Sequence, residues 1–236
     1  GANGASYPDF GTAMLLSLIQ SFQELKFKFG WRPLRSIYFI SFGGSEFNFA
    51  GSTELIEQQL TMIKDEVFAV LDISQLGINT SEKRIDVQSH PLMHQFFKNV
   101  NNRMGFSVSV RNVEQYGDWT PFLANGIPVS VLSMPEMLDS KPPIDTSKDV
   151  FGNIGKLLEE QEYRKKASDL LVYVLQASLK LADYPLLPFD ITGYLNILGE
   201  LLRDMNVRYA NILNFGDVIK SFLTWREIGE EWSAWS

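Results

Sequence analysis

Residues 30–57 read GWRPLRSIYFISFGGSEFNFAGSTELIE, and this stretch decides the fold. Its first part, residues 36–42 (SIYFISF), is a short run of apolar, aromatic and β-branched residues before Gly43-Gly44, which predicts a buried strand followed by a loop. Residues 52–63 follow as a predicted helix, and Gly51-Ser52-Thr53 supplies capping hydroxyls at its start. In open α/β sheets the loop at the carboxyl end of a strand is where ligands and catalytic groups lie.

The loop after the predicted strand carries a specific pattern. It reads Ser45-Glu46-Phe47 and then, in the same frame, Gly51-Ser52-Thr53-Glu54. This pattern resembles the glutamate carboxypeptidase and transferrin receptor branch of the M28 zinc peptidases, whose catalytic members carry two adjacent glutamates in this loop. The resemblance covers nearly the whole chain. It implies that Ser45 stands at the position of the general base.

A serine at the base position is incompatible with the family's hydrolytic chemistry. Peptide hydrolysis at a two-metal site needs a carboxylate that takes a proton from metal-bound water and passes it to the leaving amine. A serine hydroxyl is far too weak a base to do this near neutral pH. We therefore predict that the protein is a pseudopeptidase with no catalytic residue in this loop.

The resemblance also assigns the metal ligand positions, one residue at a time. Tyr7 stands where the family has an Asp that bridges two zinc ions, and a neutral phenol is a poor bridge between two dications. Glu46 and Asp72 match two retained carboxylate ligands, and Asp145 is the nearest match to the last His ligand. The first His ligand falls upstream of Gly1. We predict a vestigial zinc site that holds no cofactor, because zinc sites need three or four good ligands.

Three other features were weighed as candidate site elements. Glutamate-selective relatives carry an arginine patch after the segment that matches residues 126–128, whereas this chain continues VSVLSMPEM and offers no guanidinium for a substrate carboxylate. Asp118 matches a polar turn beside the family's pocket, and we interpret it as an Asp that caps the turn before Trp119. His90 and His94 have the i,i+4 spacing of a metal-binding pair, but the proline after His90 disfavours helical geometry there, and neither matches a family ligand.

The order of the predicted elements supports an α/β fold independently of any single motif. Alternating helices and strands predict a doubly wound mixed sheet. The resemblance makes residues 1–185 the C-terminal part of a peptidase-like domain, whose first strands and protease-associated domain precede Gly1, so we expect a fragment or a processed piece. The predicted helices are residues 12–29, 52–63 and 91–102, and the predicted strands are residues 36–42, 67–73, 107–110 and 129–132.

The last third of the sequence is predicted to be helical. Residues 153–182 read as one long amphipathic helix, and the proline-containing segment 184–190 ends it. Residues 186–236 carry two apolar stripes, which the resemblance makes part of an incomplete transferrin receptor-type dimerisation domain. Packing within one subunit is the alternative for most of these residues, because a bundle needs its own core. The candidate homodimer contacts are Leu198, Leu202, Tyr209, Phe222 and Trp225.

Composition narrows the partners and the compartment. The formal net charge of −7 and the pI of about 4.9 argue against nucleic acid, since phosphate binding requires clustered Lys and Arg. The chain has no cysteine, so disulfides and thiolate metal sites are excluded. No apolar run has the length of a membrane span. The resemblance nonetheless implies a single-pass type II membrane protein with its anchor upstream and this region luminal or extracellular, in the endosome, vacuole or plasma membrane, and Asn79 is a candidate glycosylation site.

These observations lead to three functional hypotheses. The first is a non-catalytic transferrin receptor-like receptor or adaptor that binds other proteins and, by resemblance to fungal members, helps membrane transporters reach ubiquitin-dependent degradation. The second is a zinc-dependent carboxypeptidase or aminopeptidase with a degenerate or monozinc site built on Glu46, Asp72 and Asp145. The third is a structural role in which the fold only dimerises. An exposed apolar face favours the binding hypotheses, whereas a metal held between Glu46 and Asp72 favours the enzyme.

Overall fold

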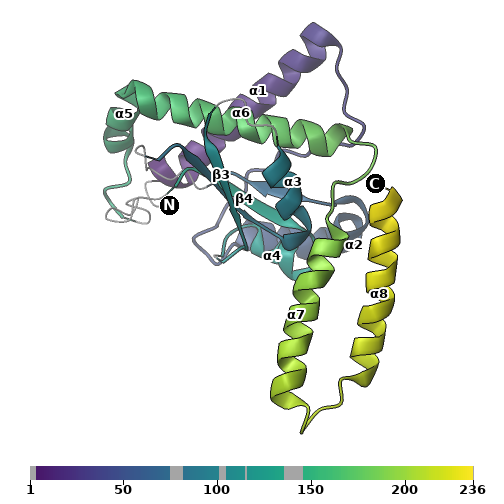
Figure 1. Cartoon of the computed structure of the whole chain (residues 1–236). Helices are drawn as coiled ribbons and strands as arrows, with labels where there is room; N and C mark the ends of the chain where they lie inside the picture. Colours follow the sequence, from purple (N-terminus) through teal and green to yellow (C-terminus); the bar gives the residue numbers. More distant parts are fainter. Residues whose placement is uncertain (1–3, 75–81, 101–104, 115, 136–145, 236) are drawn as a thin grey trace.

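A computed structural model describes residues 4–74, 82–100, 105–114, 116–135 and 146–235, with the side chains of residues 154, 157, 158 and 235 excepted. Figure 1 shows an α/β body from which a pair of helices projects. The π-helical segment η1 (Ala5–Asp9) and the 3-10 turn η2 (Pro91–Met93) accompany the strands β1 (Val70–Asp72), β2 (Arg84–Ser89), β3 (Ser107–Arg111) and β4 (Val129–Ser133). The helices are α1 (Phe10–Phe29), α2 (Ala50–Glu66), α3 (His94–Asn99), α4 (Thr120–Ala124), α5 (Phe151–Glu159), α6 (Gln161–Asp183), α7 (Ile191–Tyr209) and α8 (Gly216–Trp235).

The four described strands form one mixed sheet in the order β1-β4-β2-β3. Strand β1 runs parallel to β4, with Leu71 opposite Ser130, and β2 runs parallel to β3, with Val87 opposite Val110. The two pairs meet where β2 lies antiparallel to β4. Both parallel and antiparallel pairs therefore occur, and the predicted mixed α/β sheet is confirmed.

Helices cover both faces of this sheet, as a doubly wound arrangement requires. Successive side chains of β4 point to opposite faces of the sheet, so Val129 and Val131 lie in one hydrophobic core and Leu132 lies in the other. The larger cluster packs α1, α3 and α6 against β2 and β4, and the smaller one packs α2 and α4 against β4. The phenol of Tyr173 in α6 donates a 2.8 Å hydrogen bond to the carbonyl oxygen of Phe97 and so ties α6 to α3.

Residues 36–42 do not form a strand, which corrects the sequence prediction. Their side chains do alternate, since Ile37 and Phe39 are half-buried while Tyr38 and Ile40 are exposed. Among the described residues, however, no backbone hydrogen bond joins this segment to a neighbouring strand. The apolar pattern correctly predicted a half-buried segment, but a strand also needs a hydrogen-bonded partner, and local sequence does not specify one.

Several other predicted boundaries were also wrong. The predicted helix at residues 153–182 is divided into α5 and α6 at Glu160, whose φ of −72° and ψ of 121° are extended. The predicted helix at residues 91–102 is the turn η2 followed by the short helix α3, because Val100 adopts an extended ψ of 119°. Strand β1 is shorter than the predicted residues 67–73. The sequence did not predict β2, because its charged residues interrupt the apolar pattern of a strand. It did not predict α4 either, because that helix has only five residues.

The helices α7 and α8 form a hairpin that extends away from the α/β body in Figure 1. Asp190 caps α7, since its Oδ1 accepts a 2.8 Å hydrogen bond from the backbone N–H of Gly193. Leu198, Leu202 and Phe222 are half-buried, whereas Tyr209 and Trp225 are exposed. The ring of Phe222 lies against Gly199 on the opposite helix, so the candidate dimer contacts include residues that also hold the hairpin together. In the described part of the chain, no helix combines the length and the apolar character needed to cross a membrane.

Candidate functional site

The candidate site is built on the tight loop at residues 43–49, between the segment 36–42 and helix α2. The backbone N–H of Gly51 donates a 3.1 Å hydrogen bond to the carbonyl oxygen of Gly43. A Cβ atom on Gly51 would lie 2.4 Å from that oxygen, so this close approach requires glycine. Asn48 and Phe49 have positive φ angles of 56° and 59°, which side-chain-bearing residues seldom adopt. The loop is therefore held in one unusual conformation beside the sheet.

Asp118 connects this loop to helix α2. The hydroxyl of Ser45 donates a 2.5 Å hydrogen bond to Asp118 Oδ2, and the hydroxyl of Ser52 donates a 2.9 Å hydrogen bond to Asp118 Oδ1. Asp118 and Ser52 are both buried, which strengthens hydrogen bonds to a carboxylate. Both carboxylate oxygens of Asp118 thus accept hydrogen bonds from serines of distant segments, and no cap or turn bond from Asp118 is needed to explain its burial. The prediction that the hydroxyls of Ser52 and Thr53 cap α2 was wrong, since Phe49 is the N-cap residue of that helix and no side chain caps it.

Asp72 lies at the end of β1, close enough to Asp118 for their charges to repel. Its Oδ1 accepts two hydrogen bonds from Ser74, one of 3.0 Å from the backbone N–H and one of 2.6 Å from the hydroxyl. Burial raises the pKa of Asp72 from 3.8 to about 6, against the lowering effect of the Ser74 hydrogen bonds, and the negative charge of Asp118 adds to the rise. Two carboxylates thus lie near each other, and both accept hydrogen bonds from serine residues.

The segment that carries Tyr7 is positioned from the far end of the peptidase-like region. Asp149 is completely buried, and its Oδ1 accepts a 2.7 Å hydrogen bond from the backbone N–H of Ser6. The backbone carbonyl of Asp149 accepts a further bond of 3.3 Å from the N–H of Ala5. Gly11 lies against the backbone of Ser74, where a Cβ would be 2.7 Å from the Ser74 Cα atom. The start of α1 therefore packs directly on the turn that holds Asp72.

The structure brings together only some of the residues that the sequence singled out. Ser45 joins Asp118 and Ser52, and Asp72 lies close to that group. Glu46 is exposed on the loop and does not enter the cluster. Tyr7 is half-buried on the segment held by Asp149. Asp145 and the candidate glycosylation site Asn79 lie outside the described residues.

The donors present do not fit a dizinc centre. The resemblance puts Tyr7 at the bridging position, where two zinc ions need a carboxylate between them, and a tyrosine offers a phenol instead. Both oxygens of Asp118 accept bonds from serine hydroxyls, Oδ1 of Asp72 accepts two bonds from Ser74, and Glu46 is directed to solvent. Among the described residues, no group of three or more His, Asp or Glu side chains is arranged to hold a metal ion. We derive no catalytic step through zinc from this arrangement.

His90 and His94 also act on the backbone rather than as a metal pair. The Nδ1 atom of His90 accepts a 3.3 Å hydrogen bond from the N–H of Leu92, and Nε2 of His94 lies 2.9 Å from the carbonyl oxygen of Ser89. The His90 ring packs on Tyr194 in the first turn of α7, with centroids 5.1 Å apart. Burial and the neighbouring His94 lower the pKa of His90. This pair therefore belongs to the junction between the body and the helical hairpin.

Two contributors to the site escaped the sequence analysis. Ser52 was assigned to the helix cap, and its bond to Asp118, 66 positions away in the chain, left no local signal. Asp149 precedes helix α5, and its sequence Thr146-Ser147-Lys148-Asp149 gives no sign of burial. Aspartate is seldom fully buried, yet Asp149 is. Each is recognised only from contacts between distant segments.

A family model described as Peptidase family M28 matches residues 3–161. The chain belongs to the M28 peptidase family. The match spans the loop at residues 43–49, Asp72 and Asp118, so all the residues of the candidate site lie within the family's domain. The predicted family is confirmed.

Relatives among known proteins place the chain in the transferrin receptor-like branch of M28. It is 51% identical over 241 residues to "Putative zinc metalloprotease TRE2" of Saccharomyces cerevisiae, covering 99% of this chain and 30% of that protein. It is 25% identical to "Inactive zinc metalloprotease C354.09c" of Schizosaccharomyces pombe, covering 98% of this chain and 31% of that protein. It is 26% identical to human transferrin receptor protein 2, covering 86% of this chain and 28% of that protein. The chain thus spans about 30% of the length of these relatives.

A solved structure supports the fold. The LapA aminopeptidase of Legionella pneumophila superposes with a TM-score of 0.60 over 76% of this chain and 47% of that chain, at 18% sequence identity. Such a likeness concerns the fold alone. The solved structure and this chain therefore share the fold.

Proposed function

We propose that this chain is part of a non-catalytic M28 protein that binds another protein instead of hydrolysing peptides. The observation that carries the proposal is the hydrogen bond from Ser45 to Asp118. At the position that the resemblance gives to the general base there is a neutral hydroxyl, which is far too weak a base to take a proton from water near neutral pH, and its own proton is directed to the buried carboxylate of Asp118. Relatives named as an inactive metalloprotease and as a transferrin receptor support the same proposal.

The proposal includes a homodimer formed through the α7–α8 hairpin. Apolar residues on a projecting helical pair favour association, since monomeric proteins seldom expose large contiguous apolar patches. Trp225 is 60% exposed and Tyr209 is 46% exposed, and both are side chains of the kind that anchors interfaces. Further exposed apolar residues on the hairpin are Leu201, Met205, Val207, Ile212, Leu213, Val218, Leu223, Ile228 and Trp232.

The proposal also includes the membrane topology of the protein and the class of its binding partner. By analogy with the transferrin receptor-like branch, we propose a single-pass type II membrane protein whose described region faces the lumen or the outside. Its binding partner would be a membrane transporter destined for ubiquitin-dependent degradation. Treatment of the cell-derived protein with a glycosidase, compared with an Asn79→Gln variant, tests the orientation. A mass shift that is absent from the variant supports a luminal face, whereas cleavage of this region by a protease added to the cytosolic side of sealed vesicles contradicts it.

Zinc content and hydrolysis test the absence of catalysis. The whole protein would be equilibrated with excess zinc, passed through gel filtration and analysed by elemental mass spectrometry. Less than one tightly bound zinc per subunit, together with no hydrolysis of a panel of peptide and amino-acyl substrates, is the expected result. Two zinc ions per subunit, with hydrolysis that is lost in an Asp72→Asn variant, would overturn the proposal.

Sedimentation equilibrium of the whole protein tests the homodimer. We expect a dimer for the native protein and a shift toward monomer for a Tyr209→Ser/Trp225→Ser variant, because both rings are exposed in the single chain. The matched control is Tyr116→Ser/Phe151→Ser, which removes two exposed aromatic rings from the α/β body instead. A native monomer, or equal dissociation of both variants, would contradict this part of the proposal.

A further inference from the structure

The end of helix α1 and the turn after it have a composition unlike the rest of the chain. Residues 26–35 read KFKFGWRPLR, with four cationic residues and no carboxylate, in a chain whose formal net charge is −7. Apolar and cationic residues alternate within this short segment. We call the surface formed by Lys26, Phe27, Lys28, Phe29, Arg32 and Leu34 the α1 tip.

The apolar side chains of the α1 tip point into solvent. Phe27 is 78% exposed, Phe29 is 76% exposed and Leu34 is 69% exposed. Phe27 and Phe29 are two positions apart on a helix, so their rings project in directions about 200° apart. In Figure 1 this end of α1 extends beyond α6 and forms an apex of the molecule. The rings therefore flank a projecting point and do not make one flat patch.

The base of the α1 tip is held firmly to the body. The indole N–H of Trp31 donates a 2.7 Å hydrogen bond to Asp183 Oδ2. The Arg35 guanidinium donates to the carbonyl oxygens of Tyr184 and Pro185, at 2.5 Å and 3.0 Å, and its backbone N–H donates to the carbonyl oxygen of Ala182 at 3.2 Å. These bonds fix the turn against the C-terminal end of α6. The tip is thus a rigidly mounted projection.

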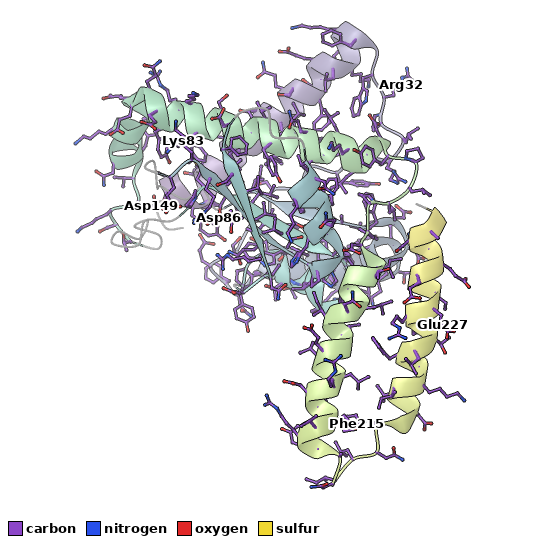
Figure 2. The ribbon with its side chains drawn as sticks, viewed as in Figure 1. Arg32, Lys83, Asp86, Asp149, Phe215 and Glu227 are labelled. Carbon is purple, nitrogen blue, oxygen red and sulfur yellow. The ribbon has the colours of Figure 1, made fainter. Side chains whose placement is uncertain are left out.

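The cations of the α1 tip are available for an outside partner. Lys28 pairs with Glu24 at 2.9 Å on the exposed helix surface, where such pairs are weak. Lys26 lies 5.7 Å from the centre of the Phe27 ring, and neither Lys26 nor Arg32 forms an ion pair within the described residues. Figure 2 labels Arg32 beside the apex, on the segment that leads from the end of α1 back toward the body. Positive charge therefore surrounds the exposed aromatic rings.

We propose that the α1 tip inserts end-on into the interfacial layer of a bilayer that contains anionic lipids. Charge complementarity supports this occupant, because Lys and Arg side chains are attracted to anionic headgroups while aromatic rings settle at the headgroup level. The directions of the two aromatic rings favour a lipid medium over a protein partner. Rings that point to opposite sides of a projection are all covered when the surrounding medium is fluid lipid, whereas a rigid protein surface covers one side. The inference does not rest on the proposed pseudopeptidase and dimer functions, and it requires anionic lipid in the leaflet that faces the α1 tip, which is the luminal or outer leaflet in the proposed topology.

The test uses the whole protein bound to or reconstituted in nanodiscs, with an NBD fluorophore attached at a Leu34→Cys substitution in a background free of other reactive cysteines. Nanodiscs contain phosphatidylcholine alone or a 7:3 mixture with phosphatidylserine, and doxyl-labelled lipid serves as the quencher. We expect quenching that is stronger with phosphatidylserine and weaker at high salt. A Lys26→Ala/Arg32→Ala variant should lower the tip association constant about 25-fold, at about 5-fold for each cation.

Matched controls separate this effect from charge or apolarity in general. Lys64→Ala/Lys156→Ala removes the same charge from α2 and α5, and should leave quenching unchanged. Phe27→Ser/Phe29→Ser should abolish quenching, whereas Phe47→Ser/Phe151→Ser, at positions 78% and 75% exposed, should not. Quenching that is independent of phosphatidylserine, or equal loss in tip and control variants, would overturn the proposal. Protection of the fluorophore from aqueous iodide by a bound protein, without lipid quenching, would assign the tip to a protein partner instead.

Discussion

Replacing Asp72 with Asn should stabilise the protein at neutral pH, although it removes a charged residue from the site. The carboxylate of Asp72 is disfavoured by burial and by the charge of Asp118, which together raise its pKa to about 6. An asparagine side chain has the same shape and retains an oxygen that can accept both hydrogen bonds from Ser74. The substitution therefore removes the unfavourable charge and keeps the local geometry.

The magnitude follows from the pKa values of the folded and unfolded chains. Raising a carboxyl pKa from 3.8 to about 6 corresponds to about 3 kcal/mol of free energy of unfolding. Because the folded pKa is the higher one, the folded state binds more protons between these values, and the native protein loses this stability as pH rises from about 4 to about 6. The Asp72→Asn variant loses none of it. We expect the variant to be about 2 to 3 kcal/mol more stable than the native protein at pH 7.5, and equally stable near pH 4.

Urea unfolding followed by tryptophan fluorescence, at pH 7.5 and near pH 4 in the presence of a chelator, measures this difference. Asp65→Asn is the control, because Asp65 is an exposed carboxylate on α2 and its loss should change stability by less than about 0.5 kcal/mol. A variant that is less stable than the native protein at pH 7.5 would refute the reasoning. That result would mean that a cation or further donors stabilise the Asp72 carboxylate.

Three more substitutions test other contacts. Arg35→Ala should lower the free energy of unfolding by about 2 kcal/mol in urea titrations, because three backbone carbonyls at the end of α6 lose a charged donor; an unchanged midpoint would contradict this. Asp118→Asn should cost about 1 to 2 kcal/mol in the same assay, since one of the hydroxyls of Ser45 and Ser52 loses its acceptor, whereas a cost equal to that of the Asp65→Asn control would show that the bridge is unimportant. Burial lowers the pKa of His90, so its stabilising contribution is present above about pH 6.5 and lost as pH falls below it; thermal unfolding at pH 7.5 and 5.5 should show a smaller pH effect in His90→Gln than in the native protein.

The sequence predicted the fold better than the site. Apolar periodicity located α1, α2, β3 and β4 within a few residues, because those elements bury a regular face. It failed at residues 36–42, where burial alternates without a hydrogen-bonded neighbour, and at Glu160, where an extended residue interrupts a continuous apolar stripe. Local patterns record which side chains are buried, and they do not record which backbone groups find partners.

Sequence by itself determined the family and the residue types at positions 7 and 45. Serine at residue 45 and tyrosine at residue 7 are read directly from the sequence, and neither side chain is the carboxylate that the family resemblance leads one to expect at that position. Only the tertiary structure decided what the remaining polar groups do. Asp118 accepts hydrogen bonds from two serines more than 60 positions away, and Asp149 holds a segment 143 positions away. Such partnerships depend on how the sheet and helices pack, since hydrogen bonds act over about 3 Å in space regardless of separation along the chain.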